Sequence, residues 1–177
     1  TCALPIYPVY RIGDQLLEVL VHRGGLSRKE ARARARELFR MVGLDPERLH
    51  YYPHEFSGGM KQRTAIAMAL ALNPSVIIAD EPVTALDVIV QHQVLETLKE
   101  RQTALGVAII MITHDISVVA QTCEYVAIMY AGKIVEYGST AQIFKNASHP
   151  YNLGLQNAFP NLLSPKDHLV SIEGYPP

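Results

Sequence analysis

Two short apolar runs limit the fold of this chain more than any other feature of its sequence. Residues 76–79 and 107–112 are apolar throughout and rich in β-branched side chains, which is typical of strands buried on both faces of a parallel sheet. Between them, residues 88–105 have the apolar spacing of a helix. A strand, a helix and a second strand in this order predict a βαβ unit, and therefore an α/β fold with a mostly parallel sheet.

Helices are predicted on the N-terminal side of this unit. Residues 12–22 carry apolar side chains at helical spacing, and Ser27 followed by Glu30 has the spacing of a capping box at the start of a second helix. The arginines of that second helix are interspersed with glutamates, so we expect them on a solvated face. A third helix begins at Ser57, and together these segments predict a helical subdomain at about residues 12–72.

A β-hairpin and short helices are predicted on the C-terminal side. Residues 125–130 and 134–137 have the pattern of two strands joined by a turn, and this hairpin would make the sheet mixed at one edge. Residues 139–146 and 151–159 each have the composition of a short helix, and prolines are frequent beyond them. We therefore expect an appended C-terminal segment.

Composition and charge disfavour several classes of protein. With 49% hydrophobic and 19% charged residues, the 177-residue chain has the composition of a folded domain. A formal net charge of -1 gives no long-range attraction to nucleic acid, and no apolar run reaches the length needed to cross a bilayer. Cys2 and Cys123 lie far apart in the sequence, which fits a reducing cytosol better than a disulfide framework.

A serine and two glycines stand at the start of the predicted third helix. Ser57, Gly58 and Gly59 would leave free backbone N–H groups near the positive end of the helix dipole. Such a place can hold a phosphate group. By itself, however, Ser-Gly-Gly is also a common turn.

Acidic residues and a histidine directly follow the two apolar runs. Because ligands of open α/β sheets bind at the carboxyl ends of the strands, Asp80, Glu81 and His114 are candidate site residues. Asp80 can hold Mg²⁺ through water, and Glu81, on the other side of an extended chain, can act as a general base toward a water that attacks the γ-phosphate of ATP. His114 can hydrogen-bond the γ-phosphate or that water.

Each of these motifs alone also has a structural interpretation. An Asp-Glu-Pro after a strand is often a turn with a helix cap, and a lone His-Asp carries little information. The three motifs occur in one order, with about twenty residues between the glycines and the carboxylates and about thirty more before the histidine. Their combination therefore indicates an ATP site. No G-x-x-x-x-G-K-[ST] phosphate loop occurs in the chain, so we expect a fragment of a longer ATPase.

These motifs resemble the signature motif, the Walker B strand and the switch histidine of ABC-type ATPases. From Pro8 onward the chain is similar to the ATP-hydrolysing subunit of an ABC importer of the dipeptide, oligopeptide and nickel class. Residues 52–60 resemble the signature of that class, and residues 84–87 resemble its D-loop. Residues 131–136, 149–151 and 172–177 resemble its C-terminal extension.

The resemblance implies ATP and Mg²⁺ as cofactors and a head-to-tail pair of ATPase domains. In such a pair the signature of one domain contacts the nucleotide held mainly by the other, whereas Asp80, Glu81 and His114 serve the nucleotide on their own side. The residues implied to contact nucleotide are Ser57, Gly58, Gly59, Met60, Gln62 and Asp87.

The resemblance also implies partners, a location and a division into domains. The partners are a second ATPase subunit, identical or different, two transmembrane permease subunits and, indirectly, an extracytoplasmic solute-binding protein, with no nucleic acid. The location is the cytoplasmic face of the inner membrane, as a peripheral subunit. Residues 8–138 would form a truncated ATPase domain, with a catalytic core at about 73–138, and residues 139–177 would begin the C-terminal extension.

The phosphate loop and the Q-loop glutamine of such a subunit would lie upstream of Thr1, so we expect the fragment alone to be inactive. Residues 1–7 do not resemble the family. Two other functions stay open at this point. One is an ABC ATPase of translation or DNA repair that has no transporter, and the other is a non-catalytic interaction module that uses a partner's nucleotide site. The C-terminal motif disfavours the first, and Glu81 with His114 disfavours the second.

Overall fold

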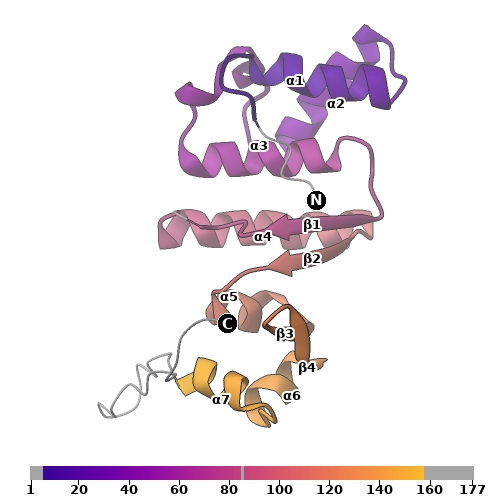
Figure 1. Ribbon diagram of the computed structural model, residues 1–177. Helices are drawn as coiled ribbons and strands as arrows, with labels where there is room; N and C mark the ends of the chain where they lie inside the picture. The colour runs from indigo at the N-terminus through magenta and orange to yellow at the C-terminus, as the bar shows by residue number, and fades with distance from the viewer. Residues whose placement is uncertain (1–5, 85, 158–177) are drawn as a thin grey trace. The chain divides into compact units, whose positions relative to one another are not determined.

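The computed structural model describes residues 6–84 and 86–157, and it divides into two compact units that meet in the sequence between Ile112 and Thr113 (Figure 1). The hairpin therefore groups with the C-terminal helices, and the predicted division after residue 138 stays a prediction. Parts of several sequence predictions lie outside the described residues: the stretch 172–177, the end of the predicted helix 151–159, and Ala85 within the D-loop-like segment.

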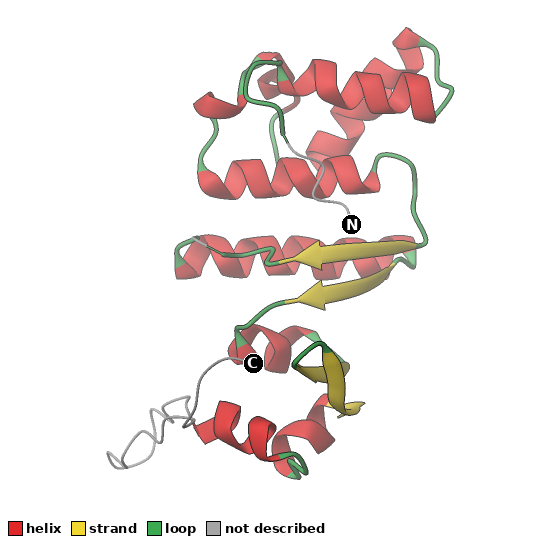
Figure 2. Cartoon of the chain, viewed as in Figure 1, coloured by secondary structure: helices red, strands yellow, loops and turns green. Residues whose placement is uncertain are grey.

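The first unit begins with the predicted helices (Figures 1 and 2). Helix α1 continues directly into a π-helical segment, η1, and a capped helix α2 follows. Two 3₁₀ segments, η2 and η3, then lead to α3. The bounds are α1 Ile12–Glu18, η1 Val19–Arg23, α2 Arg28–Met41, η2 Pro46–His50, η3 Pro53–Glu55 and α3 Gly58–Leu70.

A capping box starts α2, as the sequence predicts. The Ser27 hydroxyl accepts a hydrogen bond from the Glu30 backbone N–H at 3.3 Å, and the Glu30 carboxylate accepts one from the Ser27 N–H at 2.9 Å. The Ser27 side chain first, and the Ser27 backbone N–H second, favour the ionised carboxylate and lower the pKa of Glu30. One face of α2 then packs on α1, which buries the core residues Ala31, Ala35, Leu38 and Phe39 with Ile12, Leu16 and Leu20.

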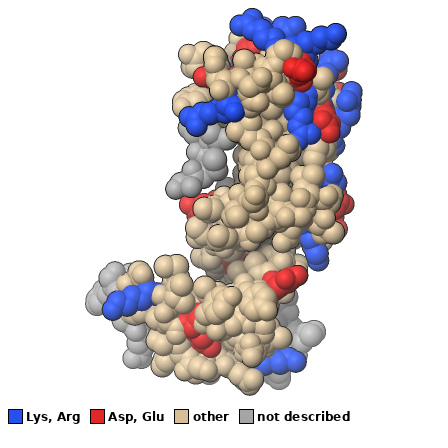
Figure 3. All heavy atoms as spheres, turned by 90° about the vertical axis from the view of Figure 1, so that its right-hand side faces the viewer, with Lys and Arg blue, Asp and Glu red and all other residues tan. Residues whose placement is uncertain are grey.

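The basic side chains of α2 lie in solvent, which confirms the expected solvated face. Figure 3 shows Lys and Arg side chains gathered at the helical end of this unit. Glutamates neutralise part of this charge, since Arg34 pairs with Glu37 at 2.8 Å and Arg36 pairs with Glu47 at 2.7 Å. Exposed pairs of this kind contribute little to stability.

The predicted βαβ unit completes the first unit. Strand β1 (Val76–Asp80), helix α4 (Val88–Leu105) and strand β2 (Ala108–Ile112) follow one another, and the strands pair in parallel from Val76 opposite Ala108 to Asp80 opposite Ile112. Asp87 caps α4 by accepting the Val90 N–H at 3.0 Å. Gly106, with φ of 64°, ends the helix in the left-handed conformation. The fold class is thus confirmed.

The sheet is not buried on both faces, contrary to the sequence prediction. Ile77 is 8% exposed, whereas the residues of β1 and β2 that alternate with it remain in contact with solvent: Val76 49%, Ile78 37%, Ile110 54% and Ile112 51%. Residues two apart on a strand share one face, and no described element of the first unit covers this one. The packing in the described residues therefore accounts for the apolar side chains on one face of the strands, but not for those on the other face.

The second unit contains, in its described residues 113–157, a hairpin and three helices. Its elements are α5 Ile116–Thr122, β3 Tyr125–Tyr130, β4 Lys133–Ser139, α6 Thr140–Lys145 and α7 Pro150–Asn157. Both turn residues, Ala131 and Gly132, have positive φ, which suits the tight turn of a twisted hairpin. In the described chain β3 and β4 form a sheet of their own. The expected mixed edge of one sheet is therefore not observed among the described residues.

The carboxylate of Glu136 on β4 holds the start of α7. The Glu136 carboxylate accepts hydrogen bonds from the backbone N–H groups of Ser148 at 2.9 Å and His149 at 3.2 Å, and from the Asn152 amide at 2.9 Å. The hydrogen bond from the Ser148 N–H is the largest cause that lowers the pKa of Glu136.

In the described part of the chain, no helix combines the length and apolarity that a membrane span requires.

Candidate functional site

The two candidate carboxylates lie at the carboxyl end of β1. Asp80 is the last residue of the strand, and Glu81 follows with φ of 46°, in the left-handed region. Glu81 therefore does not continue the extended chain, and alternation along a strand does not explain where its side chain points. Non-glycine residues adopt this conformation rarely, and such residues occur often at functional sites.

Hydrogen bonds hold Glu81 in this conformation. Its N–H donates to the carbonyl of Ile112 at 2.8 Å, so the backbone remains tied to the end of β2. Its carbonyl accepts the Thr84 N–H at 3.3 Å, which closes a turn with Pro82 at the second position, where proline is favoured. The Thr84 hydroxyl donates to the Glu81 carboxylate at 2.7 Å. Pro82 and Val83 are buried, so the turn is anchored at its tip.

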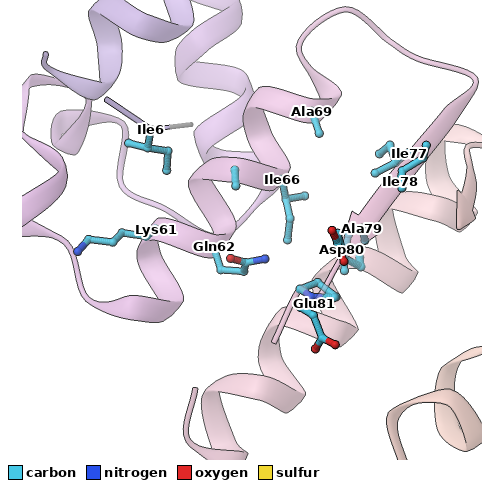
Figure 4. A pocket seen from close by; sticks show the side chains of 13 residues that line it. Ile6, Lys61, Gln62, Ile66, Ala69, Ile77, Ile78, Ala79, Asp80 and Glu81 are labelled. Atoms are coloured by element: carbon cyan, nitrogen blue, oxygen red, sulfur yellow. The ribbon is translucent and has the colours of Figure 1, made fainter. Parts of the chain in front are cut away.

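A cleft of about 330 Å³ brings three of the predicted residues together (Figure 4). Asp80 and Glu81 line it from β1, and Gln62 lines it from α3. Figure 4 shows the Gln62 side chain directed from α3 toward the end of β1. The remaining wall is mostly apolar and includes Ile66 and Ile77. A mostly apolar cleft with a few convergent polar groups is a typical ligand site.

The predicted phosphate-binding residues lie where two helices begin. Ser57 caps α3 by accepting the Met60 N–H at 3.4 Å, and Asp87 caps α4. A Cβ atom placed on Gly59 would lie 2.2 Å from Val90 Cγ1, and one on Gly58 would lie 3.0 Å from Leu86 Cδ2. The glycine pair therefore lets the start of α3 pack closely against the start of α4, in addition to any role toward a ligand.

The candidate histidine belongs to the second unit, whereas Glu81 belongs to the first. His114 is exposed and lies in the bend that leads from β2 to α5. Asp115 caps α5 by accepting the Ser117 N–H at 2.9 Å and the Val118 N–H at 3.3 Å. The helix that follows the Asp-Glu-Pro motif, α4, is capped by Asp87 and not by that motif.

The oxygen atoms of the cleft suit magnesium better than a transition metal. Within the described ranges no group of three His, Cys, Asp or Glu side chains comes together. Mg²⁺ commonly uses one or two carboxylates and completes its shell with water and substrate phosphates. The Asp80 carboxylate, which lines the cleft, is a group of the kind that such partial coordination uses.

Sequence reasoning missed two residues near the site. Thr84 contacts Glu81, although it was considered only as part of a D-loop-like segment. Lys61 lines the cleft and lies next to Gln62. The spacing of three residues from Glu81 to Thr84 around a proline is a turn signal, and it could have suggested the first contact.

Comparison with known proteins defines the class to which this fold and cleft belong. Two solved dimeric structures of the ATP-binding cassette MJ0796, one of them a post-hydrolysis state bound to ADP and Pi, match with a TM-score of 0.66. Their identity is 31% and 32%, over 77% of this chain and 59% of theirs. Together with the parallel β1–β2 pair, this similarity shows a partial P-loop NTPase fold of the ABC ATPase kind.

Sequence comparison gives the family. Residues 6–84 match the model of the ABC transporter family, and residues 135–177 match the C-terminal region of oligopeptide/dipeptide transporters. The dipeptide transport ATP-binding protein DppD of Lactococcus lactis is 49% identical over 96% of this chain and 50% of its own length. The oligopeptide transport ATP-binding protein OppD of Haemophilus influenzae is 49% identical over 96% of this chain and 53% of its own.

The chain therefore belongs to the ABC transporter ATP-binding family, in its oligopeptide/dipeptide class. It spans about half the length of the curated relatives it matches.

Proposed function

We propose that this chain is part of an ATP-hydrolysing subunit that powers ABC-type import of peptides. The observation that carries the proposal is the cleft in which Asp80 and Glu81, at the end of β1, meet Gln62 of α3. Such a cleft offers an acidic group for Mg²⁺, a second carboxylate for proton transfer and an amide for hydrogen bonding.

The roles divide among the residues as follows. Bound Mg²⁺ would neutralise charge on the phosphates of ATP. Asp80 would hold that ion through water, and Glu81 would accept a proton from the attacking water. His114 would hydrogen-bond the γ-phosphate. Ser57, Gly58, Gly59, Met60, Gln62 and Asp87 would contact nucleotide, the first three through the helix start that they form.

The partners follow from the class of the relatives. A second ATPase subunit, identical or different, would complete each nucleotide site, and the matching cassette structures are dimeric. Two permease subunits would receive the closing motion at the cytoplasmic face of the membrane, with an extracytoplasmic solute-binding protein acting indirectly. The names of the relatives support dipeptides or oligopeptides as the solute, and nickel is a further candidate.

The match of residues 135–177 to a transporter C-terminal region speaks against a role in translation or DNA repair. It favours an ATPase that works with permeases. A purely non-catalytic module would not need both a carboxylate suited to Mg²⁺, here Asp80, and a second carboxylate, here Glu81, in one cleft.

Steady-state ATP hydrolysis tests the proposal. The assay uses the chain joined to the upstream segment in which we expect the phosphate loop, with Mg²⁺, and compares wild type with Glu81→Gln. Glu96→Gln is the matched control, because it removes an exposed carboxylate on α4. We expect Glu81→Gln to abolish hydrolysis and Glu96→Gln to leave it unchanged. Equal rates in wild type and Glu81→Gln would refute the general-base role, and no hydrolysis in wild type would refute the proposed function.

A further inference from the structure

The conformation of Glu81 raises the question of what directs its carboxylate. β1 ends one residue earlier, and the φ of 46° turns the chain away from the strand direction. The left-handed conformation costs a non-glycine residue about 1–2 kcal/mol, so contacts around it must offset that cost. The described contacts of the backbone are the bonds to Ile112 and Thr84.

The side chain of Glu81 is held by the same turn. The Thr84 Oγ1 atom lies 2.7 Å from Glu81 Oε2, a separation typical of a hydroxyl that donates to an ionised carboxylate. Thr84 also donates its backbone N–H to the Glu81 carbonyl at 3.3 Å. One residue thus fixes both the backbone and the carboxylate of Glu81, and buried Pro82 and Val83 prevent the turn from moving freely.

We propose that Thr84 is a positioning residue that directs the Glu81 carboxylate for its reaction with water. The inference rests on the proposed function, in which Glu81 is the general base. The hydroxyl holds one carboxylate oxygen in place and so fixes the direction in which the carboxylate faces. A general base must be held within hydrogen-bond reach of the water that it deprotonates, and small displacements lower the rate strongly.

Neighbouring contacts fix the position of Thr84. The next described residues along the chain are Leu86, which lies against Gly58 at the start of α3, and Asp87, which caps α4. The turn is therefore held between the buried residues on one side and two helix starts on the other. Thr84 itself is exposed, but the turn that carries it is fixed by these neighbours.

Kinetics of the longer protein test the proposal through two substitutions at one position. Thr84→Val replaces the hydroxyl by a methyl group of similar shape, and Thr84→Ser keeps the hydroxyl. We expect Thr84→Val to lower kcat roughly tenfold with little change in KM for ATP, since one hydrogen bond to a charged group is lost. Thr84→Ser should stay within about twofold of wild type.

A matched control separates positioning from the general loss of a threonine hydroxyl. Thr103 on α4 donates its hydroxyl to the Lys99 carbonyl at 3.1 Å, remote in sequence from the turn. Thr103→Val should leave both kcat and KM unchanged. If Thr84→Val retained the wild-type kcat, or if Thr84→Ser lost as much as Thr84→Val, the positioning role would be refuted.

A second readout needs no hydrolysis and uses the 177-residue chain itself. In protein labelled with ¹³C-glutamate, the carboxyl resonance of Glu81 is assigned by its loss in Glu81→Gln. We expect this resonance to move in Thr84→Val and to remain in Thr84→Ser and Thr103→Val. An unmoved resonance in Thr84→Val would overturn the contact. If the longer wild-type protein were inactive, the proposed function would be refuted, and the catalytic role of the contact would be refuted with it. If the wild type were active and Thr84→Val had the same activity, only the positioning role of Thr84 would be refuted.

Discussion

Gly59 at the start of α3 lies directly against Val90 of α4, so closely that a Cβ atom on Gly59 would be 2.2 Å from Val90 Cγ1. A separation this short requires that the Val90 side chain or one of the two helices shift. The second glycine of the signature-like motif is thus needed for helix packing, whatever ligand the motif binds. This requirement can be measured separately from any nucleotide site.

Gly59→Ala should destabilise the chain by about 1–3 kcal/mol, because overpacking costs more than the roughly 1 kcal/mol that alanine gains over glycine in a helix. Urea denaturation measures the change. The double substitution Gly59→Ala with Val90→Ala removes the clash, so adding Gly59→Ala to Val90→Ala should be neutral or stabilising. An equal loss in both backgrounds would contradict the packing explanation.

Asp87→Ala should lower the free energy of unfolding by about 0.5–2 kcal/mol, because the Val90 N–H at the start of α4 loses its acceptor. Asp87→Asn retains a capping oxygen and should cost only a few tenths of a kcal/mol. Thermal unfolding followed by circular dichroism compares the two. If Asp87→Asn nevertheless lowered ATP hydrolysis in the longer protein, the charge of Asp87 would have a function beyond the cap.

The Glu136 carboxylate should make the second unit more stable near neutral pH than in acid. Its hydrogen bonds, the one from the Ser148 N–H first, lower its pKa below the ordinary value of 4.5. The contribution is therefore present above the unfolded-state pKa and is lost as the pH falls through the lower folded-state pKa. Wild type should have a higher Tm than Glu136→Gln at pH 6–7, and this difference should become smaller below about pH 4. A Tm difference that does not change with pH would show that ionisation of the Glu136 carboxylate does not contribute to stability through these hydrogen bonds.

The two faces of the sheet should respond differently to truncation. Ile77 is 8% exposed and Ile110 is 54% exposed, on neighbouring strands of one sheet. Ile77→Ala should cost about 2–4 kcal/mol and Ile110→Ala less than about 1 kcal/mol in this chain. Urea denaturation of both variants gives the comparison. Similar losses would mean that the face carrying Ile110 is covered in solution.

Sequence reasoning predicted most of the local structure correctly. The helix starts at Ser27 and Ser57, the βαβ order and the hairpin all follow from patterns within a few residues: a cap with its third neighbour, an apolar spacing, a pair of turn residues. Each pattern has the same physical cause in any context, since backbone groups near a helix end or a turn need partners close in the chain. The strand-end position of Asp80 was predictable for the same reason.

The remainder of the site depends on residues far apart in the sequence. The approach of Gln62 to Asp80, and the close packing of Gly59 on Val90, require that α3, β1 and α4 take particular positions, which no local pattern specifies. The exposure of one sheet face was missed because an apolar run indicates only that a strand can be buried. It does not indicate whether another element covers that strand.

By itself, then, the sequence determined in which kind of element each candidate residue lies, since hydrogen bonding near helix ends and the patterns of strands and turns are local. Only the tertiary structure decided that Glu81 leaves β1 in a left-handed conformation and that Thr84 holds its carboxylate. The physical reason is that a costly backbone conformation persists only where several contacts act together. Here the end of β2, a buried turn and the start of α4 supply them.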